Sequence, residues 1–268
     1  MRAKILTLTA IVFLLGACDS SKYGKKISIN EAASIANEIS KKIKVATDYT
    51  ATYEEKIILE GELLQDTLIT YTVNRDGEKS FIEEDLVENK VKEYYLVNDA
   101  EHDQIFYETA KDKDGYYRQN AFSKIDFGGS LSTVMSMPNY IDNMARDYMS
   151  IEEISQEDID ASIEAYNKNN YSLKLEYYSK DSSSLTIKTL IKTDDEEAAK
   201  KNSVAKSDQL LIYENYMFSS ISYIETFYGG GIEDVDLTVT YYDSKATITL
   251  PTDWASHLVS HDEWVSQH

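Results

Sequence analysis

Four histidines and one cysteine are the side chains of this chain best suited to metal binding or nucleophilic attack. His257 and His261 stand four residues apart, so on a helix they would share one face. With Asp253 or Asp262 they could hold a divalent ion, but zinc normally takes three or four well-ordered ligands. His261 also falls on an apolar stripe of the tail, which is a packing position. We therefore interpret these histidines as surface or packing residues and expect no metal site.

Sequence motifs for enzymatic catalysis are absent. There is no Gly-x-Ser-x-Gly elbow, no phosphate-binding Gly-rich loop and no His-Glu-x-x-His pair. Residues 229–231 are three glycines without a following Lys-Ser/Thr, which indicates a turn. The acidic runs 83–85 and 194–197 lack the ligand spacing of an EF-hand and indicate solvated surface. We predict no enzyme and no cofactor. Only carboxylate chemistry, with two facing acids about 5 to 10 Å apart, leaves no local signature.

The single cysteine, Cys18, ends a segment typical of secretion. Arg2 and Lys4 precede an apolar run of 11 residues, Ile5 to Leu15. A membrane-spanning helix needs about 20 residues, so this run is too short to be one. The layout predicts a signal peptide over residues 1–17. The sequence Leu-Gly-Ala-Cys at 15–18 resembles a bacterial lipobox. That resemblance implies that Cys18 is acylated and becomes the mature N-terminus.

Composition limits the partners and the compartment. With Cys18 acylated, the domain would hold no thiol for a disulfide, a metal or a nucleophile. The formal net charge of −20 argues against nucleic acid and disfavours lying flat on anionic lipid. We expect a monomer on the outer side of a bacterial cell membrane, held by its N-terminal acyl anchor. Residues 18–27 should form a tether that keeps the domain off the bilayer.

The pattern after the tether predicts one helix and then many short strands. Ser28 and Glu31 match a capping box, and an apolar stripe follows at helical spacing, so we expect a helix over 29–45. Beyond Asp48 the apolar period becomes two. The segments with this alternation, separated by turn residues, are 69–73, 105–108, 116–122, 171–177, 185–188, 237–241 and 246–250. Short alternating strands joined by turns favour antiparallel pairing.

Two further strands carry apolar residues on both faces, at 210–218 and 221–228. Such strands are expected to be covered on both sides. Between residues 128 and 169 the signals are helical, and four of the six methionines lie there. Methionine is adaptable and is enriched where a surface must fit varied apolar partners. This patch is either a lid over an apolar cavity or an ordinary pair of core helices.

The fold class that fits these elements is α+β. We expect a curved antiparallel sheet of about nine to eleven strands, an open half-barrel with helices packed on its concave face. One domain should span 28–251. Residues 252–268 should form an amphipathic helix or tail, with Trp254, Leu258, His261 and Val265 on one face.

The element order resembles the LolA/LppX-like lipoprotein superfamily. It runs from one amphipathic helix through a long meander with a helical insertion, and it closes at residues 241–251 with Tyr-Tyr-Asp and then Ile-Thr-Leu-Pro. The resemblance implies a half-barrel wrapped around helices, with a cavity between them for acyl chains. No binding residue is carried over from the superfamily.

Three functions are then open. The first is binding of a lipid or other apolar ligand between sheet and helices, and the residues predicted to line that site are Met135, Met137, Tyr140, Met144, Tyr213 and Tyr228. The second is a surface interaction or scaffolding role, supported by the 21 tyrosines, since tyrosine favours interfaces. The third is carbohydrate binding on a tyrosine-lined face. An apolar cavity above about 300 Å³ would favour the first.

Overall fold

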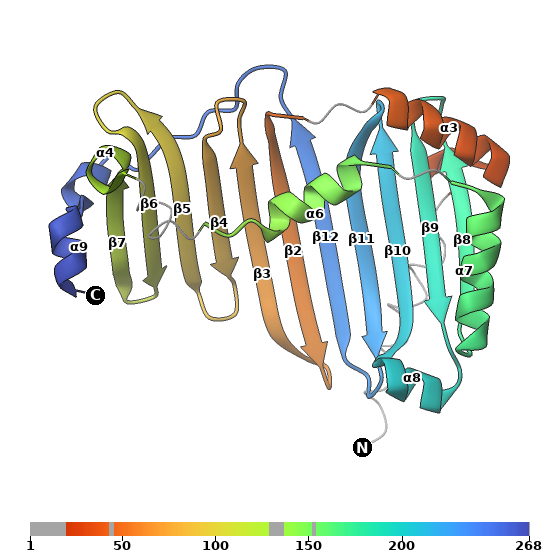
Figure 1. Ribbon diagram of the computed structural model, residues 1–268. Coiled ribbons are helices and arrows are strands. Elements are labelled where there is room, and N and C mark those ends of the chain that lie inside the picture. Colours follow the sequence, from red (N-terminus) through yellow and green to blue (C-terminus); the bar gives the residue numbers. More distant parts are fainter. Residues whose placement is uncertain (1–19, 43–45, 129–136, 152–153, 268) are drawn as a thin grey trace.

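The computed structural model describes residues 20–42, 46–128, 137–151 and 154–267 (Figure 1). Cys18, Met135 and the predicted signal peptide lie outside these residues. In the described part, twelve strands form one antiparallel sheet in the order β1-β8-β9-β10-β11-β12-β2-β3-β4-β5-β6-β7. The two outermost strands, β1 and β7, do not pair with each other, so the sheet stays open.

The strands follow one another as hairpins on either side of a central β12–β2 pair. Their bounds are β1 (Lys25–Ile27), β2 (Tyr49–Leu59), β3 (Glu62–Val73), β4 (Lys79–Asp85), β5 (Lys90–Asp99), β6 (Asp103–Asp112), β7 (Gly115–Ser123), β8 (Ser172–Ser179), β9 (Leu185–Lys192), β10 (Val204–Glu214), β11 (Met217–Phe227) and β12 (Ile232–Tyr241).

The longer helices lie on one face of this sheet, which we call the inner face. Figure 1 shows α6 (Tyr140–Met149) running across its middle, with α3 (Ile29–Lys42) and α7 (Gln156–Lys168) over the β8 side. The shorter helical segments are α2 (Ser20–Tyr23), α4 (Lys124–Phe127), α8 (Glu196–Asn202), the 3₁₀ turn η3 (Trp254–His257) and α9 (His261–Gln267).

Alternation assigns the side chains of each strand to the inner or the outer face. Leu211, Ile221, Leu237, Tyr53 and Ile69 share one register across five strands and point to the inner face. They belong to the main core cluster or pack against it, together with Ala32, Ala36 and Ile39 of α3 and Ile141 and Ala145 of α6. The predicted fold class, a curved antiparallel sheet with helices on its concave face, is confirmed.

The helix starts read from the sequence are present. The backbone N–H of Ser28 donates to Glu31 Oε2 at 2.9 Å, and the Glu31 N–H donates to Ser28 Oγ at 3.3 Å, which is a capping box. At α7 the Ser155 hydroxyl accepts from the Asp158 N–H at 3.1 Å. Each cap satisfies backbone donors that the first helical turn leaves unpaired.

The sheet has more strands than the nine to eleven we expected, and one of them comes from the predicted tether. Residues 25–27 form β1 and pair with β8, so this stretch is part of the fold. Gly24 has φ +89°, and a Cβ there would lie 2.2 Å from the Ser179 carbonyl oxygen. Glycine therefore allows the close approach of this segment to β8, whereas the sequence indicated only flexibility.

The predicted strand at 246–250 is wrong, because residues 245–250 are not in the sheet. Residues 246–250 follow β12 in the sequence, but β12 already pairs with β11 on one side and β2 on the other, so it offers no free edge for another strand. The backbone of Ala246 is satisfied by side chains instead: its N–H donates to Asp48 Oδ1 at 3.2 Å, and its carbonyl accepts from Asn74 Nδ2 at 3.0 Å. Alternation alone cannot tell whether a free strand edge exists.

Two other boundaries differ from expectation. The strand expected at 210–218 is interrupted by a hairpin turn, because Asn215 and Tyr216 have φ of 52° and 63°. Positive φ at both central residues is the geometry of a type I′ turn between β10 and β11. The tail also does not form one continuous helix, since residues 258–260 separate η3 from α9. There the Val259 N–H donates to the Ala121 carbonyl at 2.9 Å, which docks the tail on β7.

Candidate functional site

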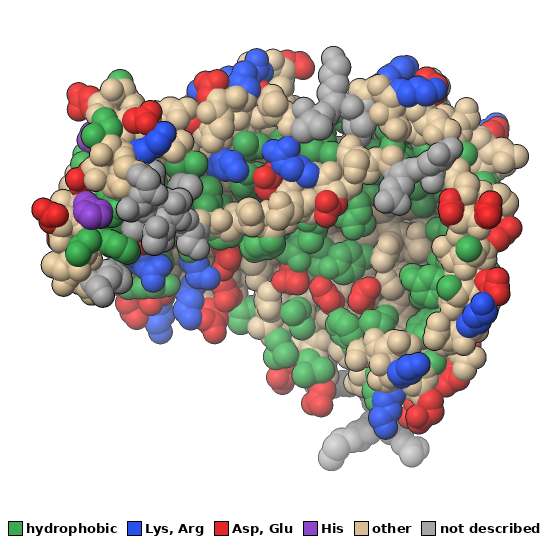
Figure 2. Space-filling model, in the orientation of Figure 1, with side chains coloured by type: hydrophobic (Ala, Val, Ile, Leu, Met, Phe, Trp, Pro, Cys, Tyr) green, Lys and Arg blue, Asp and Glu red, His purple; other side chains and the backbone are tan. Residues whose placement is uncertain are grey.

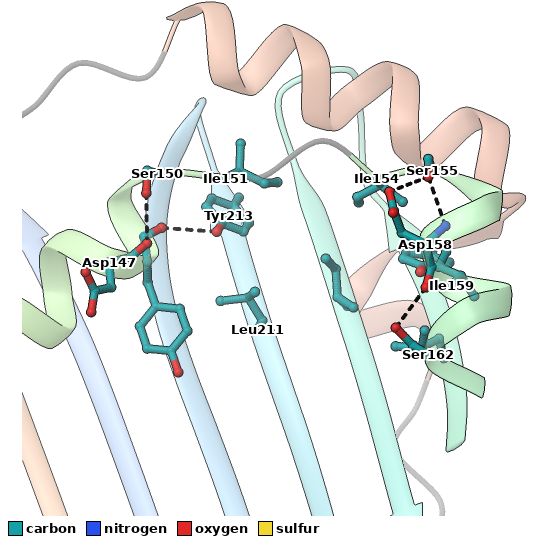
Figure 3. A pocket seen from close by; sticks show the side chains of 14 residues that line it. Asp147, Ser150, Ile151, Ile154, Ser155, Asp158, Ile159, Ser162, Leu211 and Tyr213 are labelled. Atoms are coloured by element: carbon teal, nitrogen blue, oxygen red, sulfur yellow. Dashed lines mark hydrogen bonds between the residues drawn. The ribbon is translucent and has the colours of Figure 1, made fainter. Parts of the chain in front are cut away.

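A groove of about 430 Å³ opens between the inner face of β8–β10 and the segment that runs from α6 into α7 (Figure 3). We call it the α7 groove. Its apolar lining consists of Tyr148, Ile151, Ile154, Ile159, Leu175, Tyr177, Ile187, Leu211 and Tyr213. Its polar lining consists of Asp147, Ser150, Ser155, Asp158 and Ser162. In Figure 2 the inner face is hollowed on this side of the molecule.

Strand register explains the floor of the α7 groove. Side chains alternate between the two faces along each strand, and the pairing register places Leu175, Ile187 and Leu211 on the inner face of three adjacent strands. None of these three side chains is fully buried. They pack against the main core on one side and face the groove on the other. The floor is therefore a patch of the core that the helices leave open.

The polar groups around the α7 groove are mostly engaged by the protein itself. The Tyr213 hydroxyl donates to the Tyr148 carbonyl at 3.0 Å, which ties the end of α6 to β10. Ser162 Oγ donates to the Asp158 carbonyl at 2.8 Å, and Asp158 meets the Ser155 cap (Figure 3). Burial raises the pKa of Tyr213, so its hydroxyl stays neutral. The groove offers apolar contact and a few hydroxyls rather than a set of reactive groups.

A buried carboxylate seats α6, one wall of the α7 groove, on the sheet. Asp142 is 7% exposed. It accepts hydrogen bonds from the Tyr49 hydroxyl and, at 2.8 Å, from Arg146 Nε. The Arg146 guanidinium also lies 5.8 Å from the centre of the Tyr49 ring. Burial, followed by the Asp142 hydrogen bond, raises the pKa of Tyr49. This network fixes one rotational setting of α6 over β2.

A second pocket, of about 360 Å³, continues along the inner face toward α8. It is lined by Tyr166 of α7, by Asn169 just after that helix, and by Ile191, Ser207 and Gln209 on strands β9 and β10, among others. These positions follow those of the α7 groove along the same helix and strands. The two pockets therefore lie in sequence along one side of α7.

A row of carboxylates crosses the inner face beyond the second pocket. Glu225 lines that pocket and pairs in register with Glu233 of β12. Glu55 of β2 lies opposite Val235, which is two residues beyond Glu233 on the same face of β12. Glu233 Oε1 accepts from the Tyr223 hydroxyl at 3.2 Å, and Glu55 Oε2 accepts from Gln65 Nε2 at 2.7 Å. Figure 2 shows acidic side chains on this part of the face. They lie side by side on one surface and not on two facing walls.

Of the predicted ligand-binding residues that the structure describes, which exclude Met135, Tyr213 alone lines the α7 groove. Met137 and Met144 are partly buried and pack against the main core. Tyr140 is 45% exposed, with its ring 5.8 Å from that of Phe81. Tyr228 lies beyond β11, where its hydroxyl donates to Glu196 Oε1 at 3.1 Å. The sequence reasoning missed the isoleucines and Leu211. Alternation indicated Ile187, but a pattern of neighbouring residues does not separate a groove lining from a filled core.

The tail histidines lie against aromatic rings. The His261 ring is 5.3 Å from that of Phe127, and the His257 ring is 6.3 Å from that of Tyr107. His257 Nε2 is 3.5 Å from Asp253 Oδ2. Among the described residues, no group of three or more His, Cys, Asp or Glu is placed to hold a metal ion. Within the same residues, none of the helices has the length and apolar character needed to cross a membrane.

Comparison with known proteins finds no matching family model and no matching curated protein. Among solved structures, similar ones include LprF from Mycobacterium bovis, with TM-score 0.33, 12% identity, and coverage of 85% of this chain and 99% of that chain. A putative outer membrane lipoprotein-sorting protein domain from Vibrio parahaemolyticus has TM-score 0.25, 10% identity and coverage of 85% and 98%.

A LolA superfamily protein from Nitrosomonas europaea has TM-score 0.19, 9% identity and coverage of 80% of this chain and 94% of its own. It belongs to the superfamily that the sequence resembles. TM-scores this low carry no argument about residues or ligands.

Proposed function

We propose that this protein is a membrane-anchored extracytoplasmic lipoprotein that binds a lipid or another apolar ligand in the α7 groove. The observation that carries the proposal is the groove itself. Its volume of about 430 Å³ lies within the range of small-molecule sites, and nine apolar or aromatic side chains line it. Removing apolar surface from water is favourable by about 25 cal/mol per Å², so a ligand that covers the lining of the groove would be stabilised.

The second pocket supports a long ligand. It follows the α7 groove along the same side of α7 and adds about 360 Å³. An acyl chain is apolar and unbranched, so it could lie along both pockets. The proposal includes no catalysis, because the polar groups at the groove are structural caps and hydrogen-bonded hydroxyls.

Native mass spectrometry of protein purified without detergent, with an organic extract analysed in parallel, tests the proposal. We expect a co-purifying apolar ligand that is lost on Leu211→Glu, because Leu211 faces the groove. Leu210→Glu is the matched control. Leu210 is the next residue on β10 and equally half-buried, but it faces the outer side of the sheet. Ligand that survives in Leu211→Glu, or a wild-type protein that never carries any, contradicts the proposal.

The anchor is tested separately. Cys18→Ala should block processing or release the protein from membranes, because the acylated thiol would be gone. Mass spectrometry of the wild-type N-terminal peptide should show a mature chain that begins with acylated Cys18. A Cys18→Ala protein that is processed normally and stays in the membrane fraction would rule out the anchor.

A second function, surface interaction without a small ligand, is favoured by one observation. Large apolar residues are exposed near the hairpin turns of β2–β3, β4–β5 and β6–β7, namely Leu59, Leu63, Leu64, Leu86, Val87, Tyr116 and Tyr117. Exposed apolar residues gathered at one end of strands mark contact sites for other molecules. An empty α7 groove in the mass spectrometry experiment, with unchanged folding, would make this the better reading.

A further inference from the structure

The N-terminal segment is docked on the outer face of the sheet, close to the predicted anchor. Tyr23 of α2 is only 5% exposed. The Lys188 ammonium lies 4.7 Å from the Tyr23 ring centre and 5.3 Å from that of Tyr178. Lys188 and Tyr178 face outward, because Ile187 and Tyr177 line the α7 groove on the inner face. The described chain thus begins on the outer side of β8 and β9.

This docking leaves almost no free tether. Ser20 begins α2, and Cys18 stands two residues before it. Two residues span at most about 7 Å, since an extended chain covers roughly 3.5 Å per residue. If Cys18 carries the acyl chains, the body of the protein must sit directly against the bilayer. The part nearest the bilayer is then the outer face of β8–β10 together with residues 20–27.

The charge of that region is opposite to the charge of the chain as a whole. On α2 and the outward-facing positions of β1, β8, β9 and β10 there are six lysines and three carboxylates. The lysines are Lys22, Lys26, Lys174, Lys188, Lys192 and Lys206, and the carboxylates are Glu176, Asp208 and Glu214. We call these nine residues the basic edge. The formal net charge of the whole chain is −20.

Two of these lysines, Lys22 and Lys192, are exposed and available to an external partner, because within the described part of the chain neither has a carboxylate within salt-bridge distance. Lys188 also has no such carboxylate, but its ammonium is held against the Tyr23 and Tyr178 rings.

Farther along the same outer face carboxylates outnumber lysines, with Asp234 and Asp236 on β12 and Glu54 on β2 around Lys56. The outer face therefore has a basic end at β8 and β9 and an acidic region that begins at β12, where Asp234 and Asp236 line one pocket with Lys188.

From these observations we infer that the basic edge is a membrane-docking surface that lies on anionic lipid headgroups. The inference rests on the anchor in the proposed function. A basic patch supplies the second membrane signal that makes acyl anchoring stable, and an anionic surface attracts lysines within a screening length of about 10 Å. This inference replaces our expectation that the acidic protein stands off the bilayer. That expectation used the net charge of the whole chain, which does not reveal a local patch of the opposite charge.

The test uses the full lipidated protein in nanodiscs, with and without anionic lipid, and a headgroup-attached quencher. Acylated Cys18 leaves no free thiol, so one introduced cysteine takes a fluorophore. Ser172→Cys places it on the exposed, outward-facing start of β8. Thr52→Cys places it on the same face of β2, five strand spacings or about 24 Å away across the sheet. We expect stronger quenching at 172 than at 52, and we expect the quenching at 172 to weaken without anionic lipid or at about 0.5 M salt.

The lysines are tested by charge reversal. Lys22→Glu and Lys192→Glu together should reduce the quenching at 172. The control pair Lys79→Glu and Lys113→Glu makes the same charge change away from the basic edge and should leave the quenching intact. The salt and lipid dependence of the wild-type protein decides the matter if the first pair does not fold.

The outcomes separate the inference from the anchor. Equal quenching at 172 and 52, or quenching at 172 that ignores anionic lipid, overturns the inference while an acylated Cys18 leaves the anchor standing. A chain without acyl groups on Cys18 by mass spectrometry overturns the anchor, and the docking inference with it. Ligand binding in the α7 groove is scored independently by native mass spectrometry.

Discussion

Single residues decide how the N-terminal segment is held. Gly24 allows a backbone approach that any side chain would block. Two residues later, Lys26 Nζ lies 2.7 Å from Glu176 Oε1, and Lys174 Nζ lies 2.9 Å from the same oxygen. The hydrogen bond from Lys26, followed by the one from Lys174, lowers the pKa of Glu176 to about 2. The docked segment therefore depends on one close backbone contact and one shared carboxylate.

Gly24→Ala should loosen this segment, because its new Cβ would lie 2.2 Å from the Ser179 oxygen. Gly61→Ala is the control, since Gly61 also has positive φ, +84°, but a Cβ there meets nothing within 4 Å. Left-handed backbone alone costs an alanine about 1 kcal/mol. In urea unfolding we expect Gly61→Ala to lose about that much and Gly24→Ala at least twice as much. Only Gly24→Ala should expose Lys25 and Lys26 to trypsin, and equal effects of the two variants would argue against a docked segment.

The Glu176 cluster should make the docking sensitive to acid. Because the folded-state pKa lies below the ordinary value of 4.5, the ionised cluster stabilises the fold above that value. The stabilisation is lost as pH falls from about 4.5 through about 2. Trypsin cannot report at such pH, so hydrogen exchange of residues 25–27 is the measurement, with Glu176→Gln as comparison. We expect the β1 amides of Glu176→Gln to be weakly protected from exchange already at pH 7, and acid should then reduce their protection no further.

At the scale of elements, α6 and α7 convert a sheet surface into a groove. α6 contributes Tyr148 and is held to β2 by Asp142, whereas α7 is capped by Ser155 at the groove rim. The segment between these helices carries Ile151 and Ile154, which also line the groove. Moving either helix would therefore change the groove before it changed the sheet.

Asp142→Ala should release α6 from its seat. The substitution removes two hydrogen bonds to a buried carboxylate. Hydrogen bonds to charged groups contribute about 1.5 to 3 kcal/mol each to stability, and the contribution of the Arg146 bond is smaller because Arg146 is partly exposed to solvent. We expect a loss of about 2 kcal/mol in urea unfolding, together with faster hydrogen exchange in α6. Asp147→Ala, on the same helix but exposed, should change stability by less than about 0.5 kcal/mol. A similar loss in both variants would show that the Tyr49–Asp142 contact does not seat the helix.

Local patterns predicted those elements whose signals are local. The capping box at Ser28, the cap at Ser155 and the strand alternation depend on neighbouring residues, and the structure contains all three. Pairing and closure depend on distant residues, so the strand at 246–250 was wrong. Tyr216 with positive φ gives no turn signal, because tyrosine rarely adopts that conformation. Of the residues predicted to bind a ligand, Tyr213 lines the α7 groove, and the other groove residues could not be predicted because exposure of an inner-face residue depends on where the helices end.

At the scale of the whole molecule, charge is distributed unevenly over the outer face. The basic edge lies at β8–β10, and Asp234 and Asp236 lie on β12. Burial is the first cause that raises the pKa of both aspartates, and Glu54 adds to it for each. The acidic end thus holds carboxylates whose ionised forms are disfavoured in the fold. This cost adds to the self-repulsion expected for a net charge of −20.

Asp234→Asn should therefore stabilise the protein at neutral pH. The folded-state pKa of Asp234 lies above its ordinary value of 3.8, so the folded state prefers the protonated carboxyl. Below about 3.8 the carboxyl is protonated in both states, and the amide should give no gain. As pH rises through the folded-state pKa, the wild-type carboxyl ionises in the fold at a cost that asparagine avoids, so the gain from asparagine should reach its full value.

Thermal unfolding at pH 7 should show a rise of roughly 1 to 2 °C in the midpoint, the size expected for a surface substitution of about 0.5 kcal/mol. Salt screens both the attraction of Lys56, which opposes the gain, and the repulsion of Glu54, which adds to it, so the gain that comes from burial should persist at high salt. Asp243→Asn removes the same charge from an exposed loop and should leave the midpoint almost unchanged at every pH. A gain that persists below pH 3.8, or that Asp243→Asn shares, would show that asparagine acts through something other than the buried charge.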